Sequence, residues 1–260
     1  SGIKIYPALG YFPFDIRLKE IYEYALEKEI PILTHCIRGT VYFRGNKGVA
    51  FNNEKYHPFR KCQIPLYGRK PKDFTLNFTH PLNYECLLNQ EVLSDIWGMT
   101  APDFRKLELC LGHYGGDDEW VKYLTDPWLP SSYTTNKSWT PLKLNGPWFH
   151  EHKSNNFNQK KPYSWFSICN ELMFKYENVY SDISYIISNP EVYPMIKMLL
   201  TTGYYKDIKH KILFGTDYFV VSKEGSDREL SIKLRAFIGE DLYKTIAHDN
   251  PSKFLRNSLN

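Results

Sequence analysis

The feature that most constrains the fold of this chain is a short apolar run that recurs along it, each time followed by a polar residue. The runs are rich in β-branched and aromatic residues, as buried strands are, and they cover residues 3–7, 30–34, 107–112, 178–181 and 211–216. Segments of helical periodicity lie between and after them, at residues 18–28, 84–96, 165–176, 190–202, 229–238 and 241–247. Strand and helix in repeated alternation predict an α/β fold with a parallel sheet and helical crossovers.

Two long stretches, at about 38–78 and 114–164, interrupt this alternation. Both are rich in Gly, Pro, Asn and aromatic residues, and each follows a strand end that carries a histidine. Connections of this length in a compact domain are typically lids or binding loops. We therefore expect one domain, 1–260, with two insertions. The tryptophans of the second insertion, Trp120 and Trp165 among them, indicate a lid, a base-stacking surface or, most commonly, a small satellite core.

Side chains with chemically reactive groups end four of the predicted strands: His35, His113, Asp182 and Asp217. Because the carboxyl ends of parallel barrel strands meet at one mouth, we expect these side chains to face a common pocket. Neutral imidazoles and a carboxylate suit a divalent ion such as zinc, and an open coordination position lets bound water ionise near neutral pH. A lone histidine after a strand is more often an ordinary loop residue, but the glycines beside these positions allow close backbone approach and favour a site.

Charge and cysteine content exclude several classes of protein. The 33 Lys and Arg against 29 Asp and Glu give a formal charge of +4 that is spread along the chain, so a nucleic-acid partner is not expected. The five cysteines are widely spaced and lack a CxxC pair, which argues against a disulfide framework and favours a reducing compartment such as the cytoplasm. No stretch approaches the roughly 20 apolar residues of a membrane span, so no membrane partner is expected.

By their order and spacing, six segments resemble the amidohydrolase superfamily, in particular the amidohydrolase-related branch that includes aminocarboxymuconate semialdehyde decarboxylase. The segments are "GIKIYPALGY" (2–11), "PILTHC" (31–36), "LELCLGHYGG" (107–116), "NVYSDIS" (178–184), "KILFGTDYF" (211–219) and "HDNPSKFL" (248–255). The resemblance spans nearly the whole chain apart from the two insertions. It implies a (β/α)8 TIM-type barrel of which this chain supplies the C-terminal portion, about strands 4 to 8, with residues 3–7 as strand four.

The resemblance also implies roles for individual residues. His35 would be a metal ligand at the end of strand five, and His113 would be the strand-six histidine that activates water or polarises the substrate. Asp217, at the end of strand eight, would serve as metal ligand and general base. The implied ion is Zn²⁺, with Mn²⁺ as the alternative. Arg38 and Tyr218 are predicted to bind the substrate, Arg38 by offering a bidentate fork to a carboxylate.

The chain departs from the family pattern at its start, because the His-x-His metal ligands of the family's first strand have no counterpart before residue 3. One such pair occurs at His150 and His152, but it lies in the second insertion, where surface histidines are the simpler interpretation. We expect either truncation of a longer enzyme, which we favour, or a fragment completed by another chain. An open half barrel exposes sheet edges, which predicts a homo-oligomer or association with the missing N-terminal part. Because His35 and Asp217 alone would hold a metal weakly, we expect this chain by itself to be metal-free and inactive.

The expected function is therefore a metal-dependent hydrolase of a small-molecule substrate, in which activated water attacks an amide, ester or lactone carbon. Non-oxidative decarboxylation at the same site is the family's second chemistry, and the sequence does not separate the two. A third alternative is a non-catalytic, degenerate barrel that binds a macromolecular partner through its aromatic insertions. The presence of His35, His113 and Asp217 favours an enzyme over this alternative.

Overall fold

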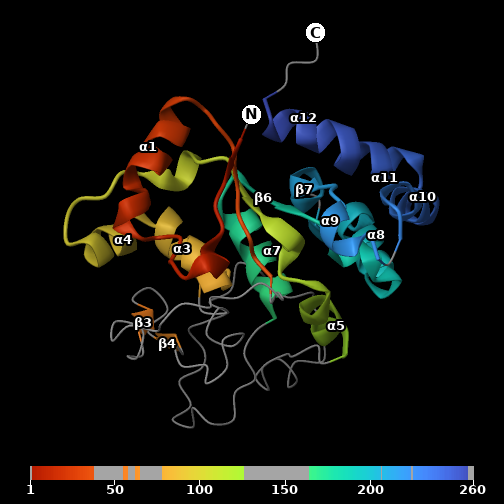
Figure 1. The fold of residues 1–260 in the computed structure, drawn as a ribbon, viewed down its shortest axis with the longest axis horizontal. Helices are drawn as coiled ribbons and strands as arrows, with labels where there is room; N and C mark the ends of the chain where they lie inside the picture. Colours follow the sequence, from red (N-terminus) through yellow and green to blue (C-terminus); the bar gives the residue numbers. More distant parts are fainter. Residues whose placement is uncertain are drawn as a thin grey trace.

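A five-stranded parallel sheet forms the centre of the molecule (Figure 1). The computed structural model describes residues 2–37, 55–57, 62–64, 78–125, 164–205, 207–223 and 225–256. The strands are β1 (Ile3–Lys4), β2 (Ile32–Leu33), β5 (Leu109–Leu111), β6 (Val179–Asp182) and β7 (Ile212–Leu213), hydrogen-bonded in that order and all parallel. Each overlaps a predicted apolar run, so the expectation of an α/β fold with a parallel sheet is confirmed. Among the described residues, β1 and β7 are the two outer strands of this sheet.

The helices follow the strands along the chain much as the periodicity predicted. They are α1 (Lys19–Glu27), α3 (Leu82–Leu88), α4 (Gln90–Trp97), α5 (Asp117–Thr125), α7 (Trp165–Lys175), α8 (Tyr193–Thr201), α9 (Tyr218–Val221), α10 (Asp227–Ile238), α11 (Glu240–Lys244) and α12 (Asn250–Phe254). In the part of the chain that the structure describes, none of them is long and apolar enough to cross a membrane.

The prediction of one continuous helix over 84–96 is wrong, because the chain forms two helices that meet at Asn89. Asn89 adopts extended backbone angles, with φ −95° and ψ 105°, and its side chain accepts a hydrogen bond from the backbone N–H of Val92 at 3.1 Å. Asparagine caps a new helix well because its side chain replaces a missing backbone acceptor. The second helix, α4, then ends at Gly98, whose φ of 65° suits glycine.

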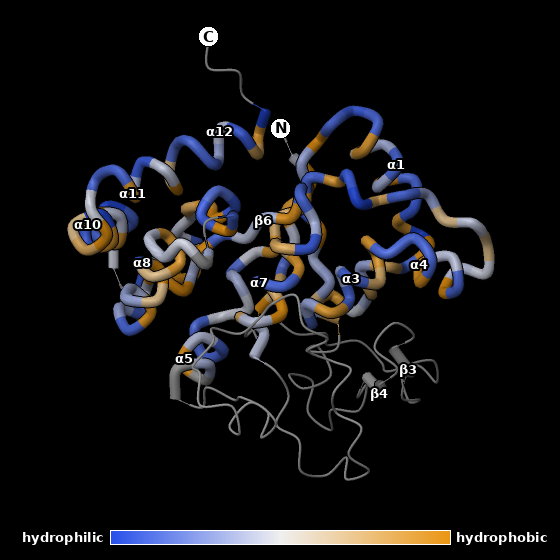
Figure 2. Tube along the Cα trace, turned by 180° about the vertical axis from the view of Figure 1, so that it is seen from behind, coloured by the Kyte–Doolittle hydropathy of each residue, from blue (hydrophilic) through white to orange (hydrophobic). Residues whose placement is uncertain are grey.

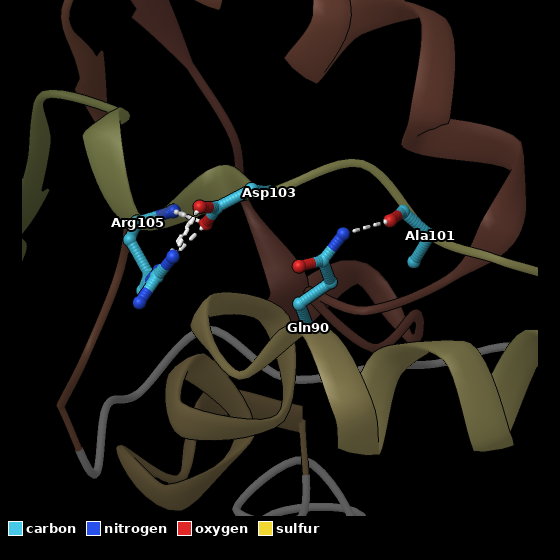
Figure 3. A network of polar contacts seen from close by, with 4 residues as sticks. All are labelled: Gln90, Ala101, Asp103 and Arg105. Carbon is cyan, nitrogen blue, oxygen red and sulfur yellow. Dashed lines mark hydrogen bonds and ion pairs between the residues drawn. The ribbon is translucent and has the colours of Figure 1, made fainter.

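Polar contacts fix the segment that leads from α4 into β5 (Figure 3). The Gln90 side chain donates to the carbonyl oxygen of Ala101 at 2.7 Å. Two residues later, Asp103 accepts from the backbone N–H of Arg105 at 3.1 Å and from its Nε at 2.8 Å, which starts a short 3-10 turn. These contacts set the direction in which the chain enters the sheet.

Side chains along the strands alternate between two faces, as the pleat requires. We call one the helix-covered face; its residues join the main core beneath the helices and are Ile32, Leu109, Leu111, Val179 and Ile212. The opposite, inner face forms a small cluster of Leu33, Cys110, Tyr180 and Leu213 with Phe254 of α12. Strand register puts Lys4 beside Leu33 and Asp182 beside Leu213, so both charged residues lie on the inner face. Figure 2 shows the hydrophobic segments concentrated around β6 and α7.

Both insertions contain regular structure that the sequence did not predict. The first includes an antiparallel pair, β3 (Lys55–His57) and β4 (Cys62–Ile64), and the second begins with α5. Trp120 and Trp165 are fully buried in the main core, so the interpretation of these two rings as part of a lid, a base-stacking surface or a satellite core is wrong. Most other residues of the insertions, Arg38 and the His150 and His152 pair among them, lie outside the described residues.

The carboxyl-terminal helix α12 closes the amino end of the sheet. Arg256, just after α12, pairs with Glu29 before β2 at 2.5 Å and with Glu108 before β5 at 3.0 Å. Asn250 donates from its side chain to the carbonyl oxygens of Lys209 and Ile212, both at 2.8 Å, which ties α12 to the start of β7. The carboxyl end of the sheet is thus the end at which polar residues can meet a ligand.

Candidate active site

Two histidines from neighbouring strands meet at the carboxyl end of the sheet. His35 follows β2 and His113 follows β5, and both side chains are buried. Although 78 residues separate them in sequence, Nδ1 of His35 lies 3.1 Å from Nε2 of His113. The rings stand edge to face, with centroids 4.8 Å apart. The sequence prediction that these two side chains share one site agrees with this geometry.

Tyr6 covers the other side of His35. It lies two residues beyond β1, on the same face as Lys4, and its ring stacks on the imidazole with centroids 4.3 Å apart and an angle of 29°. The Tyr6 hydroxyl lies 3.4 Å from Nε2 of His35, which is a long hydrogen bond. Burial raises the pKa of Tyr6, and the nearby Asp217 carboxylate raises it further. Sequence analysis missed Tyr6. It follows Lys4 by two residues, and this spacing puts both side chains on the same face of an extended chain.

Asp182 and Ser184 support His113 from the neighbouring strand. Ser184 Oγ lies 2.8 Å from Nδ1 of His113 and donates its own proton to Oδ1 of Asp182. The same carboxylate oxygen accepts the backbone N–H groups of His113, at 3.1 Å, and Ser184, at 3.0 Å. Sequence analysis named Asp182 but missed Ser184. The signal was the spacing of two residues, which puts both side chains on one face of an extended chain.

The cost of charging His35 is high in this environment. Burial lowers its pKa to about 3, and the neighbouring His113 and Lys4 contribute in the same direction. An imidazole removed from water loses the solvation of its charged form, so it stays neutral. At neutral pH His35 therefore offers a ring nitrogen with a free lone pair, as a metal ligand must.

A cavity of about 510 Å³ runs along the inner face from the amino end to His113. His113, Asp182, Ser184 and Asp217 line its polar part, together with Lys4. The Lys4 ammonium donates to the carbonyl oxygen of Thr34 at 3.0 Å. Burial lowers the pKa of Lys4, while the carboxylates of Asp182 and Asp217 act in the opposite direction. One cation thus faces two carboxylates across a space that can admit a small molecule.

Backbone strain gathers in the loops that follow the strands. His113 and Tyr114 after β5, Tyr185 after β6 and Asp217 after β7 all have positive φ, between 45° and 68°. They make up four of the six non-glycine residues with positive φ in the described ranges. Such conformations are costly for residues with a side chain and recur at active sites, where the surroundings enforce them. This observation is independent of residue type and points to the same edge of the sheet.

Tyr218, predicted to bind the substrate, opens α9 directly after Asp217. Its side chain is half exposed, and its ring contacts that of Phe219, with centroids 5.7 Å apart. Phe219 is 93% exposed, so the start of α9 presents apolar surface to solvent beside the cavity residue Asp217. A role for Tyr218 in substrate binding stays a prediction.

Cys36 follows His35 on the opposite, helix-covered side. It is fully buried, and its Sγ lies 4.0 Å from that of Cys169 on α7. Burial raises the pKa of the Cys36 thiol well above its usual range, which keeps it protonated. Cys36 therefore packs within the main core.

The nitrogen and carboxylate donors at the site are of the types that zinc binds, but too few of them lie among the described residues for a complete site. Within the described ranges, no group of three or more His, Cys, Asp or Glu side chains is arranged to hold a metal ion. His35 offers Nε2, which the Tyr6 hydroxyl contacts only weakly, and Asp217 offers a carboxylate. Zinc sites in proteins require at least three protein ligands. The described residues therefore supply part of a metal site and not a complete one.

The sequence matches no family model, and no curated protein matches it. The amidohydrolase resemblance therefore rests on the six segments alone and stays a prediction.

Proposed function

We propose that this chain carries the active site of a metal-dependent hydrolase of the amidohydrolase type, acting on a small-molecule amide, ester or lactone. The observation that carries the proposal is the contact between His35 and His113 at the ends of adjacent parallel strands, with Asp217 on the cavity that His113 lines. Residues from distant parts of the sequence converge at the edge where barrel enzymes bind substrates. The strained backbone at His113 and Asp217 gives independent support.

The proposed barrel has support in the order of the strands. The five parallel strands are adjacent in the order in which they occur in the chain, as successive barrel strands are. The inner face lines a cavity and carries charged residues, and α12 covers its amino end. Further strands that pair with the outer edges of β1 and β7 would close the barrel and bring the missing metal ligands to the same edge.

In the proposed reaction, Asp217 accepts the proton of the attacking water while the water oxygen bonds to the carbonyl carbon. The leaving nitrogen or oxygen takes that proton as its bond to carbon breaks. His113, anchored through Nδ1, contacts His35 through Nε2, and by exchanging that contact for water or substrate it orients either by hydrogen bonding. Lys4 offsets the charge of the two carboxylates. A zinc ion held by His35, Asp217 and further ligands would acidify the water.

A serine-nucleophile triad built from Ser184, His113 and Asp182 fits the geometry poorly. In such a triad the carboxylate bonds to the second ring nitrogen of the histidine. Here Asp182 bonds to the serine hydroxyl instead, and the second nitrogen of His113 faces His35. Ser184 consequently donates its proton to a carboxylate and is not activated by the histidine.

Metal titration tests the proposal. We would strip the chain and the full product of its gene with a chelator, add zinc or manganese, and measure binding by calorimetry. We expect the full product to bind about one equivalent, His35→Ala and Asp217→Ala to lose it, and the control His248→Ala, an exposed histidine outside the site, to keep it. Unchanged zinc affinity in both site variants would contradict the proposal.

Reaction products then separate the two chemistries. A panel of amides, esters and lactones that bear carboxylates is incubated with the metal-loaded protein, and products are followed by mass spectrometry. Incorporation of oxygen from labelled water indicates hydrolysis. Release of CO₂ without such incorporation favours the decarboxylase alternative, and inactivity together with metal-free protein favours the non-catalytic one.

A further inference from the structure

Asp182 is a buried carboxylate whose Oδ1 contacts converge on one histidine, while its Oδ2 accepts a weak hydrogen bond from Sγ of Cys110 at 3.6 Å. It is 8% exposed, and within the described residues no Lys or Arg forms an ion pair with it. Its Oδ1 instead accepts three protons, from the backbone of His113, the backbone of Ser184 and the Ser184 hydroxyl. A carboxylate buried in this way is costly unless these bonds satisfy it. Its contacts therefore indicate that Asp182 holds His113 in position.

The direction of each hydrogen bond follows from the chemistry of the acceptors. A carboxylate only accepts, so the Ser184 hydroxyl proton is committed to Asp182, and Oγ is left to accept from His113. The carbonyl oxygen of Ser184 lies 3.3 Å from the same Nδ1 and also can only accept. Both contacts require that the proton of the neutral His113 ring sits on Nδ1.

The same reasoning extends to the second histidine. With its proton on Nδ1, His113 has a lone pair on Nε2, which must accept the hydrogen bond from Nδ1 of His35. His35, kept neutral by its burial, then has its lone pair on Nε2, facing the Tyr6 hydroxyl. One carboxylate on β6 thereby determines the proton positions on two rings that follow β5 and β2.

We propose that Asp182 and Ser184 are positioning residues that hold both His113 and His35 in the Nδ1–H tautomer. In this arrangement the Nε2 lone pair of His113 accepts the hydrogen bond from His35, and the Nε2 lone pair of His35 is presented to the site at neutral pH. This is the form in which His35 can ligate a cation while His113 holds its ring in place. The meaning of the arrangement for catalysis rests on the proposed function, whereas the tautomers themselves can be measured without any reaction.

The test is ¹⁵N NMR of the metal-free chain with labelled histidine, which reads the protonation of each ring nitrogen at one fixed neutral pH. In the wild type we expect both histidines as Nδ1–H. In Ser184→Ala the hydroxyl acceptor is lost, and the ratio of Nε2–H to Nδ1–H should rise roughly five- to tenfold, the effect of one hydrogen bond. The shift should occur in His113 and His35 together, because His113 Nε2–H can only donate to a deprotonated Nδ1 of His35.

Two variants separate positioning from simple destabilisation. Ser184→Thr keeps a hydroxyl and should restore the wild-type tautomers. Ser181→Ala removes a buried hydroxyl of the same strand, which donates to the Leu111 carbonyl and does not touch the histidines, and should leave both rings unchanged. Ser184→Ala with wild-type tautomers would overturn the proposal.

The wild-type spectrum decides the matter even where Ser184→Ala does not fold. A wild-type His113 in the Nε2–H form would overturn the proposal without any variant. If the tautomers are as expected but zinc does not bind, the proposed function fails and the positioning role stands. If zinc binds but the tautomers differ from those expected, the positioning role fails and the proposed function stands.

Discussion

The two faces of the sheet are built from the same strands and differ in what they bury. The helix-covered face presents Ile32, Leu109 and Val179 to a continuous apolar core, with each side chain fully buried. The inner face has a small apolar cluster, and beyond it Lys4 and Asp182 line a cavity. Apolar burial on one face stabilises the sheet and permits charged groups, which would be costly within a dry core, on the other.

This difference explains where the candidate site lies. Residues at alternate positions continue the inner face past the ends of the strands, so that Tyr6, His35 and Ser184 emerge on the same side as Lys4, Leu33 and Asp182. Residues at the intervening positions, such as Cys36, point their side chains into the main core. The site is therefore an extension of the inner face, supported from behind by the largely apolar helix-covered face.

The largest effect should come from opening the helix-covered face. Leu109→Ala removes a fully buried side chain, and we expect the free energy of unfolding to fall by about 3–5 kcal/mol. Leu33→Ala on the inner face removes a half-buried side chain and should cost about 1–2 kcal/mol. Urea unfolding at neutral pH measures both. Equal losses would mean that the two faces contribute alike and that the contrast is wrong.

The second effect is the pH dependence that His35 brings to the inner face. Its folded-state pKa of about 3 lies below the ordinary value of 6.5. As the pH falls through 6.5 the unfolded chain binds a proton that the folded chain does not, so stability is lost down to about pH 3. We expect a loss on the order of 3 kcal/mol between about pH 7 and about pH 4 in metal-free protein.

Comparison with His35→Gln isolates this contribution from that of the carboxylates. The variant lacks the titrating ring, so its free energy of unfolding should fall less over the same interval. The measurement is a series of urea unfolding curves at fixed ionic strength. Parallel pH profiles for the two proteins would show that His35 is not held neutral by the fold.

Much of the fold and part of the site were predictable from the sequence, for a reason that particular residues illustrate. Apolar runs that end in His35, His113 and Asp217 revealed the parallel strands and their shared edge, because burial and strand ends leave local signals. Tyr6 and Ser184 were missed because neither is the polar residue that directly follows an apolar run, and only their spacing of two residues from Lys4 and Asp182 identifies them. The burial of Trp120 depends on tertiary contacts that no local pattern encodes, whereas the break at Asn89 had a local signal in its capping side chain.

The smallest effect tests whether the inner face is tightly packed where the site begins. Gly112 lies on this face just before His113, and a Cβ atom there would come within 2.3 Å of the Thr34 carbonyl oxygen and 3.5 Å of Oδ2 of Asp182. The nearest atom belongs to the backbone of Thr34, just after β2. Gly112→Ala must therefore push the ends of β2 and β5 apart, and we expect the free energy of unfolding to fall by about 1–3 kcal/mol. Gly203→Ala, where nothing lies within 4 Å of the new atom, is the matched control and should be nearly neutral. If Gly112→Ala unfolds in urea at the wild-type midpoint and leaves the ¹⁵N signals of His35 and His113 unchanged, the strand ends are not tightly packed here. The contact between the two histidines would then not require glycine at this position.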